Sequence, residues 1–243
     1  MMQSYSSTKS SGYKVIKAIR LQKSLLTKGP QWDVLYDIAN VAKGYFVKRS
    51  MDFCLAALFI ILFSPLYLLI AIIIKIDSPG EVFYKETRMG FHGKKFKIWK
   101  FRTMQSDAEK LQESLEHLNE IKDGVSFKIK NDPRITRFGK LLRRSSLDEL
   151  PQMINVIRGE MSLVGPRPFN MRDVNKFAEH YFFRYEVLPG ITGLWQVSGR
   201  SNVLNFERVI ELDIHYIKNW SIWLDIKILL KSVKVVLSAE GAY

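Results

Sequence analysis

The chain has 243 residues, of which 47% are hydrophobic, so it can form one ordinary domain core and still supply a membrane element. Its 37 lysines and arginines exceed its 24 aspartates and glutamates, and the net charge of +13 favours polyanions such as lipid head groups, nucleotide diphosphates or nucleic acid. The sequence has no zinc-finger spacing, aromatic RNA-binding signature or basic heptad array, so nucleic acid has only the charge in its favour and is not an expected partner.

Residues 1–47 are expected to form a basic N-terminal extension. The first 12 residues are rich in serine and predict disorder, whereas residues 15–26 predict a short basic amphipathic helix suited to an anionic membrane surface. Gly29-Pro30 should end that helix, and a second helix is expected over residues 32–47. The first 30 residues have no acidic residue and no apolar core, so they predict no signal peptide, and the soluble parts should stay in the cytoplasm.

A run of 22 residues without charge extends from Phe53 to Ile74. As one straight helix it would reach about 33 Å, which is enough to cross a bilayer. Ser64-Pro65 lies at its middle, and because Pro65 has no N–H, the carbonyl of Ile61 loses its partner and the helix should bend. The hydroxyl of Ser64 is the expected substitute donor for that carbonyl.

Basic residues flank both ends of the run, namely Lys48 and Arg49 before it and Lys75, Lys85 and Arg88 after it. Lysine and arginine in short loops mark the cytoplasmic side, so both ends favour the same side of the membrane. We therefore expect residues 48–76 to form a re-entrant helix-break-helix; a bent helix that crosses the membrane once is the alternative. Asp52 lies one helical turn from Lys48 and Arg49, and pairing with them would reduce the cost of a carboxylate at the membrane boundary.

Residues 77–243 predict a mainly helical domain with a small β element, so the expected fold class is α+β. Short strands are expected at residues 81–84 and 95–104, with Gly90 and Gly93 in the turn between them. A polar helix is expected over residues 105–121, and another helix over residues 207–216.

The last predicted helix follows Trp220 and Trp223 and carries a row of lysines on one face, Lys227, Lys231 and Lys234. Cations on one side and tryptophans at the boundary are typical of an interfacial amphipathic helix. A surface helix packed on its own domain is an equally good interpretation.

Two adjacent acids, Asp148 and Glu149, precede an apolar helical pattern that ends at Gly159. Pro151 fits only the first turn of a helix, so this helix should begin around residues 147–150 with both carboxylates at its N-terminus. The unpaired N–H groups and the dipole there lower a carboxylate's pKa, and the turning chain lets both side chains face one site. The alternative is a capping box, in which Glu149 merely closes back on Ser146.

Basic residues surround the acidic pair. Five precede it, Arg134, Arg137, Lys140, Arg143 and Arg144. Arg167 follows within Gly165-Pro166-Arg167-Pro168, where two prolines should hold the loop stiff, and a preset guanidinium suits bidentate contact with a phosphate. Cations beside an ionised acid pair are typical of a phosphoryl-transfer site. A solvated basic face would explain the charge, but not the stiff arginine loop.

In these and other segments the sequence resembles the small monotopic phosphoglycosyl transferases of the bacterial sugar transferase family, which act as undecaprenyl-phosphate sugar-phosphate transferases. The resemblance runs from about Lys48 to Leu237. Its ordered blocks are Lys48-Arg49 with Asp52, Ser64-Pro65, and residues 100–104, 146–152, 161–168, 189–193, 211–213 and 216–219. Residues 1–47 depart from the smallest members, so their role and the oligomeric state stay open.

The resemblance implies a re-entrant helix broken at Ser64-Pro65 and roles for the site residues. Asp148 would attack the sugar-bearing phosphate of a UDP-sugar, release UMP and carry a phosphosugar, which undecaprenyl phosphate would then accept. Asp148 and Glu149 would hold Mg²⁺, with Glu149 supporting either the metal site or the nucleophile. Phosphate would be bound by Arg143, Arg167 and Arg102.

The implied setting is the bacterial inner membrane, with the catalytic domain facing the cytoplasm and with inner-membrane lipids and a second copy of the chain as further partners. The product would enter the assembly of exopolysaccharide, capsule, O-antigen or glycoprotein glycans. A non-catalytic membrane scaffold that binds nucleotide-sugars is the competing hypothesis, since it needs the basic cleft but neither acid. The donor sugar cannot be predicted, because the candidates differ by single hydroxyls or acetamides.

Overall fold

The computed structural model describes residues 32–108, 110–111, 113–118, 129, 131–199 and 206–238. Internal contacts divide the chain into two units, Met1–Lys48 and Arg49–Tyr243, and the core and the site described below belong to the second unit. The predictions for residues 1–31, a serine-rich disordered segment and a basic amphipathic helix, lie outside the described residues.

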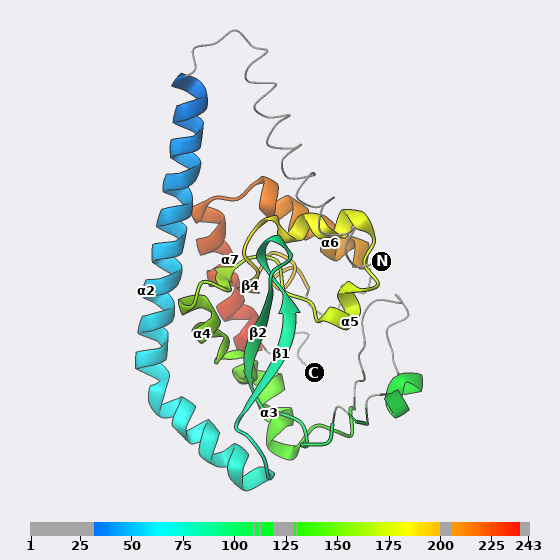
Figure 1. The fold of residues 1–243 in the computed structure, drawn as a ribbon. Helices are drawn as coiled ribbons and strands as arrows, with labels where there is room; N and C mark the ends of the chain where they lie inside the picture. The colour runs from blue at the N-terminus through cyan, green and yellow to red at the C-terminus, as the bar shows by residue number, and fades with distance from the viewer. Residues whose placement is uncertain are drawn as a thin grey trace. The chain divides into compact units, whose positions relative to one another are not determined.

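The apolar run lies within one long helix, α2, which extends from Trp32 to Asp77 (Figure 1). Ser64 Oγ donates a hydrogen bond to the carbonyl oxygen of Ile61 at 2.9 Å, which confirms the predicted substitute for the N–H that Pro65 lacks. The helix changes direction in its cyan part but is not interrupted (Figure 1). The break predicted at Ser64-Pro65 is therefore a bend inside a continuous helix, because the serine hydroxyl keeps the backbone carbonyl satisfied.

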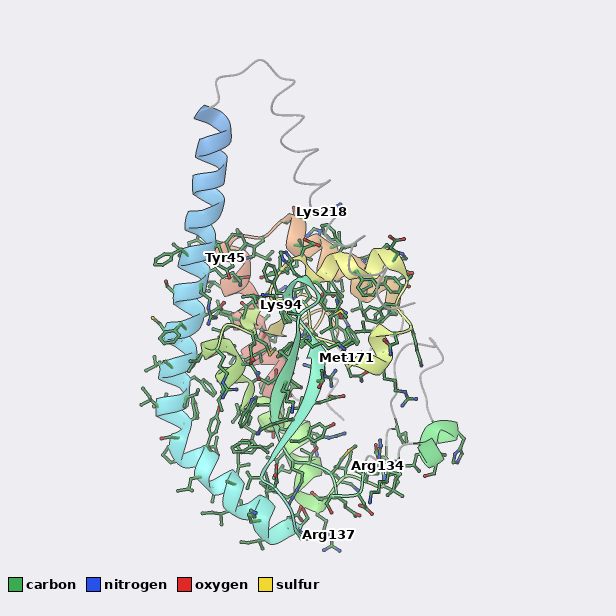
Figure 2. All side chains as sticks on the ribbon, viewed as in Figure 1. Tyr45, Lys94, Arg134, Arg137, Met171 and Lys218 are labelled. Carbon is green, nitrogen blue, oxygen red and sulfur yellow. The ribbon has the colours of Figure 1, made fainter. Side chains whose placement is uncertain are left out.

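The part of α2 in the second unit buries only a narrow strip of its surface. Ala56, Ile70 and Ile74 are buried, whereas six large apolar side chains are more than half exposed: Leu58, Ile61, Leu62, Leu68, Leu69 and Ile76. Figure 2 shows side chains of this helix extending outward along its length. Among the described residues, the segment Gly44–Asp77 is long and apolar enough to cross a membrane. An exposed apolar surface of this extent indicates association with a membrane.

The antiparallel hairpin that follows α2 consists of β1 (Phe83–Met89) and β2 (Lys95–Phe101), with Phe83 opposite Phe101. The turn contains the 3₁₀ helix η1 (Phe91–Gly93), where Gly93 has a φ of +75°, a conformation that glycine adopts without steric cost. The predicted turn is confirmed, but β1 continues to Met89 rather than ending at residue 84. Its inner face carries the charged Glu86 and Arg88, which concealed the alternation of a strand.

The rest of the second unit consists of short helices and a small parallel sheet. The helical elements are η2 (Glu113–Leu118), α3 (Arg137–Ser145), η3 (Leu147–Glu149), α4 (Gln152–Ile157), α5 (Met171–Val174), η4 (Glu179–Glu186), α6 (Phe206–Lys218) and α7 (Ile222–Ser238). The parallel sheet, which was not predicted, pairs β3 (Ser162–Val164) with β4 (Gly190–Thr192). Within the described part of residues 105–121, the predicted polar helix is replaced by a turn and η2. The predicted mixture of helix and sheet is confirmed.

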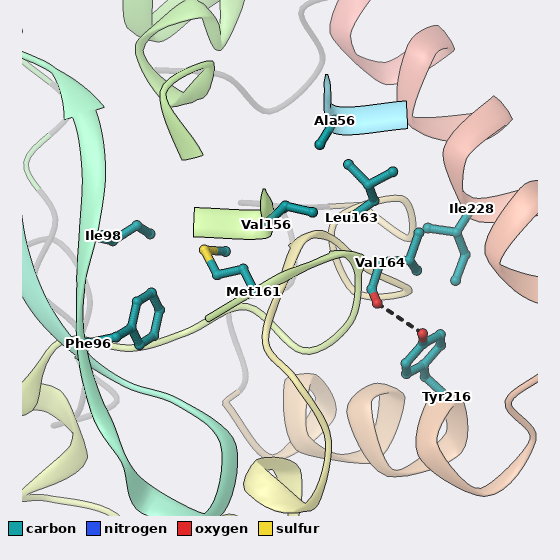
Figure 3. Close-up of a cluster of buried hydrophobic side chains, with 9 residues drawn as sticks. All are labelled: Ala56, Phe96, Ile98, Val156, Met161, Leu163, Val164, Tyr216 and Ile228. Carbon is teal, nitrogen blue, oxygen red and sulfur yellow. Dashed lines mark hydrogen bonds between the residues drawn. The ribbon is translucent and has the colours of Figure 1, made fainter. Parts of the chain in front are cut away.

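One hydrophobic core cluster joins α2, β2, α4, β3, α6 and α7 (Figure 3). Its buried members are Ala56, Phe96, Ile98, Val156, Met161, Leu163, Val164, Tyr216 and Ile228. Tyr216 Oη donates its one hydrogen to Asp225 Oδ1 at 2.7 Å and lies 3.1 Å from the carbonyl oxygen of Val164, so α6, α7 and β3 meet at one polar group inside the apolar core. The core therefore ties the C-terminal helices to the strand that precedes the arginine loop.

The two C-terminal helices bear out part of the sequence analysis. The helix predicted over residues 207–216 is α6. On α7, Ile228 is buried in the core, whereas Trp223, Leu230 and Val233 are exposed. The burial of Ile228 confirms that α7 packs on its own domain. Its other side exposes apolar residues near the lysines, and the interfacial role of that side stays a prediction.

Candidate active site

The acidic pair lies on the 3₁₀ helix η3, between α3 and α4. The chain ends α3 at Ser146, which adopts a left-handed conformation with a φ of 58°, and α4 begins only at Gln152, after Pro151. The prediction that the acids lie in the first turn of α4 is therefore wrong. They lie in a separate turn before it. Ser146 makes no side-chain capping bond to η3, so the structure does not show the capping box.

Glu149 is held by two cations. Lys100 Nζ donates to Glu149 Oε1 at 2.8 Å. Arg167 Nη1 donates to Oε2 at 3.1 Å, and Arg167 Nη2 donates to Oε1, which makes a bidentate pair. Burial acts to raise the pKa of Glu149, but the charges of Arg167 and Lys100 outweigh it and hold the pKa well below its usual range. Glu149 is therefore ionised at neutral pH.

Asp148 has a different environment, although it is the next residue. Its side chain is buried, and its nearest cation is Lys100, whose Nζ lies 3.9 Å from Asp148 Oδ2. Burial raises the pKa of Asp148; Lys100 opposes this rise, and the negative charge of Glu149 adds to it. Among the described residues, Asp148 thus forms no close bidentate pair, which keeps its oxygens available for another partner.

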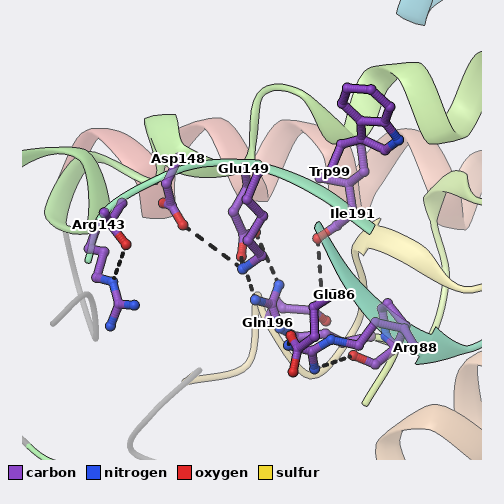
Figure 4. A network of polar contacts seen from close by, with 12 residues as sticks. Glu86, Arg88, Trp99, Arg143, Asp148, Glu149, Ile191 and Gln196 are labelled. Carbon is purple, nitrogen blue, oxygen red and sulfur yellow. Dashed lines mark hydrogen bonds and ion pairs between the residues drawn. The ribbon is translucent and has the colours of Figure 1, made fainter. Parts of the chain in front are cut away.

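Arg143 lies on the other side of Asp148 from Glu149 (Figure 4). Its Nε donates to Thr103 Oγ1 at 2.9 Å, which fixes the direction of the guanidinium. In the described part of the chain, its terminal nitrogens form no hydrogen bond, so they can bind an anion next to Asp148. Burial lowers the pKa of Arg143, but an arginine remains charged at neutral pH.

The arginine loop Gly165–Pro168 brings Arg167 to the acidic pair from the β3–β4 side. Gly165 N donates to the carbonyl of Thr192 at 2.9 Å, and Gly190 N donates to the carbonyl of Pro166 at 2.9 Å. A Cβ on Gly190 would lie 2.1 Å from Gly165 N, so only glycine permits this contact of the two backbones. These backbone contacts hold the loop in addition to its two prolines, and its stiffness stays a prediction.

The residues predicted at the membrane boundary connect α2 to the site. Arg49 donates to the carbonyls of Val156 and Ile157 at the C-terminal end of α4, the latter at 3.1 Å, so it caps α4 instead of pairing with Asp52. The fully buried Asp52 accepts from Leu163 N at 3.1 Å. Lys48 lies on α2 at the end of the first unit.

The second half of α2 also reaches this region. Beyond the bend, Tyr67 Oη donates to the carbonyl of Leu150, the residue after Glu149, at 2.6 Å. Arg102, predicted to bind phosphate, donates to Ser78 O at 2.6 Å and to Ile74 O at 3.3 Å. The structure gives Arg102 a role in joining the end of α2 to β2, and we leave it out of the phosphate-binding set proposed below.

Two parts of this arrangement were missed at the level of the sequence. Lys100 contacts both acids from β2, and its signal is its position two residues after the buried Ile98, which places both on one face of the strand. Thr103 orients Arg143, and no feature of the sequence singles it out. Together, the site offers one available carboxylate, one fixed carboxylate and three cations around them, which suits transfer of a phosphoryl group.

Residues 43–239, most of the chain, match the bacterial sugar transferase family. The chain belongs to this family. The exopolysaccharide production protein of Rhizobium meliloti is 42% identical over 205 residues, which cover 82% of this chain and 89% of that protein.

Two longer relatives of the sugar transferase have names that state a reaction. The undecaprenyl-phosphate galactose phosphotransferase of Salmonella typhimurium is 40% identical over 209 residues, which cover 84% of this chain and 44% of that protein. The UDP-glucose:undecaprenyl-phosphate glucose-1-phosphate transferase of Escherichia coli is 40% identical over 216 residues, which cover 86% of this chain and 44% of that protein. The chain spans less than half the length of several curated relatives it matches.

Proposed function

We propose that this sugar transferase moves a sugar 1-phosphate from a UDP-sugar to undecaprenyl phosphate, through a covalent phosphosugar on Asp148. The names of the relatives from Salmonella typhimurium and Escherichia coli support the reaction class. The observation that carries the proposal for this chain is the division between the two acids. Arg167 and Lys100 hold Glu149, whereas Asp148 lies beside the same cations without a close partner of its own.

The reaction would proceed by two displacements at one phosphorus atom. An ionised Asp148 oxygen forms a bond to the sugar-bearing phosphorus, the bond from that phosphorus to the bridging oxygen breaks, and UMP leaves with the electron pair. A phosphate oxygen of undecaprenyl phosphate then attacks the same phosphorus and releases the Asp148 carboxylate. Lys100, Arg143 and Arg167 would stabilise the charge on the phosphate oxygens in both steps, because they are already oriented before the reaction.

Mg²⁺ is the metal that this site fits best. Among the described residues, no cluster of three or more metal-ligating side chains is present, so a dedicated protein cage is not offered. Magnesium usually binds one or two carboxylates together with substrate phosphates, and Asp148 and Glu149 can supply the protein's share. When bound, the ion would neutralise charge on the diphosphate.

The membrane arrangement we propose is re-entrant. Near its start, the apolar part of α2 is bonded to α4 and β3 through Arg49 and Asp52. Near its end, the carbonyl of Ile74 is bonded to Arg102 of the segment after β2. A helix that crossed a bilayer would separate its ends by the membrane thickness, whereas here both ends attach to one compact domain. We place that domain on the cytoplasmic side of the bacterial inner membrane, where UDP-sugars are available.

The decisive experiment measures UMP release from a panel of UDP-sugars by the purified enzyme in membranes that contain undecaprenyl phosphate and magnesium. The panel includes UDP-glucose and UDP-galactose, because the names of the relatives include both sugars. We expect one donor to be preferred, and we expect Asp148→Asn to abolish both UMP release and the trapped phosphosugar adduct.

The matched control is Asp107→Asn, which changes an exposed aspartate and should leave UMP release unchanged. Full activity of the Asp148→Asn enzyme would refute the assignment of the nucleophile. Binding of UDP-sugars by the unaltered protein without any UMP release would favour a non-catalytic binding protein instead.

A further inference from the structure

The backbone of the arginine loop is bonded at each of its four residues. Its first two residues are held by the backbones of Thr192 and Gly190, as described above. Its last two residues are held by side chains: Arg184 Nη2 donates to the carbonyl of Arg167 at 2.8 Å, and Arg88 Nη1 donates to the carbonyl of Pro168 at 3.3 Å. Arg184 therefore acts on the backbone of the same residue whose side chain holds Glu149.

Arg184 is itself oriented by a buried carboxylate. Its Nη2 donates to Asp213 Oδ2 on α6 at 2.6 Å, and both side chains are at most 2% exposed. One Nη2 group has two hydrogens, and here they serve Asp213 and the carbonyl of Arg167. Burial raises the pKa of Asp213 to about 6. Because this value is still below neutral pH, the carboxylate is mostly ionised there.

Stability alone is a poor explanation for this pair. Burial of two charges carries a large desolvation cost, and an apolar pair of similar volume often stabilises a core as well or better. Two other donors of Arg184, Nε and Nη1, are buried without a hydrogen-bond partner among the described residues, which adds to the cost. Packing of the guanidinium at 4.4 Å from the ring centre of Phe169 offsets only part of it.

We infer that Arg184 and Asp213 are positioning residues, which fix the backbone of Arg167 so that its guanidinium meets the transferred phosphate. The inference rests on the proposed function. The contacts form one chain, from Asp213 through Arg184 to the carbonyl of Arg167, and from the guanidinium of Arg167 to Glu149. A shift of the Arg167 backbone would displace the phosphate-binding group even though neither Arg184 nor Asp213 touches the substrate.

The first test is Asp213→Asn, which keeps the size of the side chain and removes its charge. We expect kcat for UMP release, counted per folded enzyme, to fall by about 10- to 100-fold with a smaller change in KM for the UDP-sugar. The control is Glu211→Gln on the same helix. It removes an ion pair with Arg208 whose N···O distance, 2.7 Å, is similar, but whose two side chains are at least 60% exposed. That control should retain full turnover.

A second variant separates positioning from folding. Arg184→Met combined with Asp213→Leu replaces the buried charges by apolar side chains, so the domain should remain folded, but the hydrogen bond to the carbonyl of Arg167 is lost. We expect this enzyme to unfold at a temperature close to that of the unaltered protein and yet to turn over about 10- to 100-fold more slowly. A stable double variant with full turnover would overturn the inference.

A double-mutant cycle shows whether the effect passes through Arg167. Asp213→Asn should lower kcat much less in an Arg167→Lys enzyme than in the unaltered enzyme. The logarithm of the fold-decrease should be less than half as large, because both changes disturb the same contact. Equal costs in both backgrounds would refute the inference. An unaltered protein that releases no UMP from any donor would instead refute the proposed function, so the two failures are distinct.

Discussion

At the scale of single residues, the site depends on the unequal surroundings of Asp148 and Glu149. Glu149 binds Lys100 and a bidentate Arg167, and its pKa is held well below its usual range. Asp148 is buried with Lys100 only at 3.9 Å, and its pKa is raised. Two neighbouring carboxylates whose pKa values are pushed apart can divide the work: Glu149 orients the cations, and Asp148 forms the bond.

The pH dependence of turnover should report this division. In the proposed reaction Asp148 attacks only when ionised, so activity should fall as the pH drops through its raised pKa, above the usual range of an aspartate. Lys100 opposes the rise, so Lys100→Met should raise the pKa of Asp148 further and move the acid limb of kcat/KM to higher pH. Glu149→Gln removes a negative neighbour and should move the limb to lower pH.

The measurement is UMP release across a pH series for these two variants and for Lys97→Met. Lys97 is an exposed residue of the same strand, and its loss should leave the acid limb in place. An acid limb that moves to lower pH in the Lys100→Met enzyme would show that burial and Lys100 do not control the pKa of Asp148.

Most of the charged groups at the site could be predicted from the sequence, but the contacts among them could not. Asp148, Glu149, Arg143 and Arg167 stand out because acids and arginines cluster near a helix start and a proline-flanked loop. Lys100 was missed as a ligand of the acids because 49 residues separate it from Glu149. The alternation of β2 predicts which side chains share a face, but only the packing of the hairpin on η3 determines what that face meets.

At the scale of elements, the guanidinium of Arg49 joins the side of α2 to the C-terminal end of α4. Arg49 binds the carbonyls of Val156 and Ile157 at the end of α4, and the carbonyl of Val156 also accepts from Gly159 N at 3.0 Å. The helix that indicates membrane association therefore supports the short helix that follows the acidic pair.

Replacement of Arg49 tests this joint. Arg49→Ala removes the donor to the carbonyl of Ile157 and one of the donors to the carbonyl of Val156, and it should destabilise the domain by about 1–3 kcal/mol. We expect a lower unfolding temperature in detergent and a reduced rate of UMP release. Arg144→Ala, which removes an exposed arginine of α3, is the control. Equal unfolding temperatures for the two variants would show that the capping contact contributes nothing.

Features that depend on neighbouring residues could be predicted from the sequence, and features that depend on distant segments could not. The Ser64–Ile61 hydrogen bond follows from the missing N–H of Pro65 and involves only neighbouring residues, so the sequence was sufficient. The β3–β4 sheet was not predictable in this way, because each strand has three residues and the pairing depends on the close approach of Gly165 and Gly190 from distant segments. Short strands give too few positions for an alternation to be recognised.

At the scale of the whole molecule, the proposed re-entrant topology places residues 1–47 and the acidic pair in the same compartment. The test uses Cys54→Ser enzymes that each carry one new cysteine, either at Ser4 or at Ser106, in intact cells. Both cysteines should resist a membrane-impermeant thiol reagent until the cells are opened. Labelling of Ser4→Cys alone in intact cells would establish a helix that crosses the membrane once.

The hydrogen bond from Tyr67 to the carbonyl of Leu150 has a consequence for the lipid substrate. Tyr67 lies two residues past the bend of the apolar helix, and Leu150 adjoins Glu149, so this contact joins the apolar helix directly to the turn that carries the carboxylates. A long isoprenoid tail can then stay dissolved among the acyl chains while only its phosphate rises to react. In the proposed reaction, transfer takes place at the boundary of two phases, and neither substrate has to leave the one in which it is soluble.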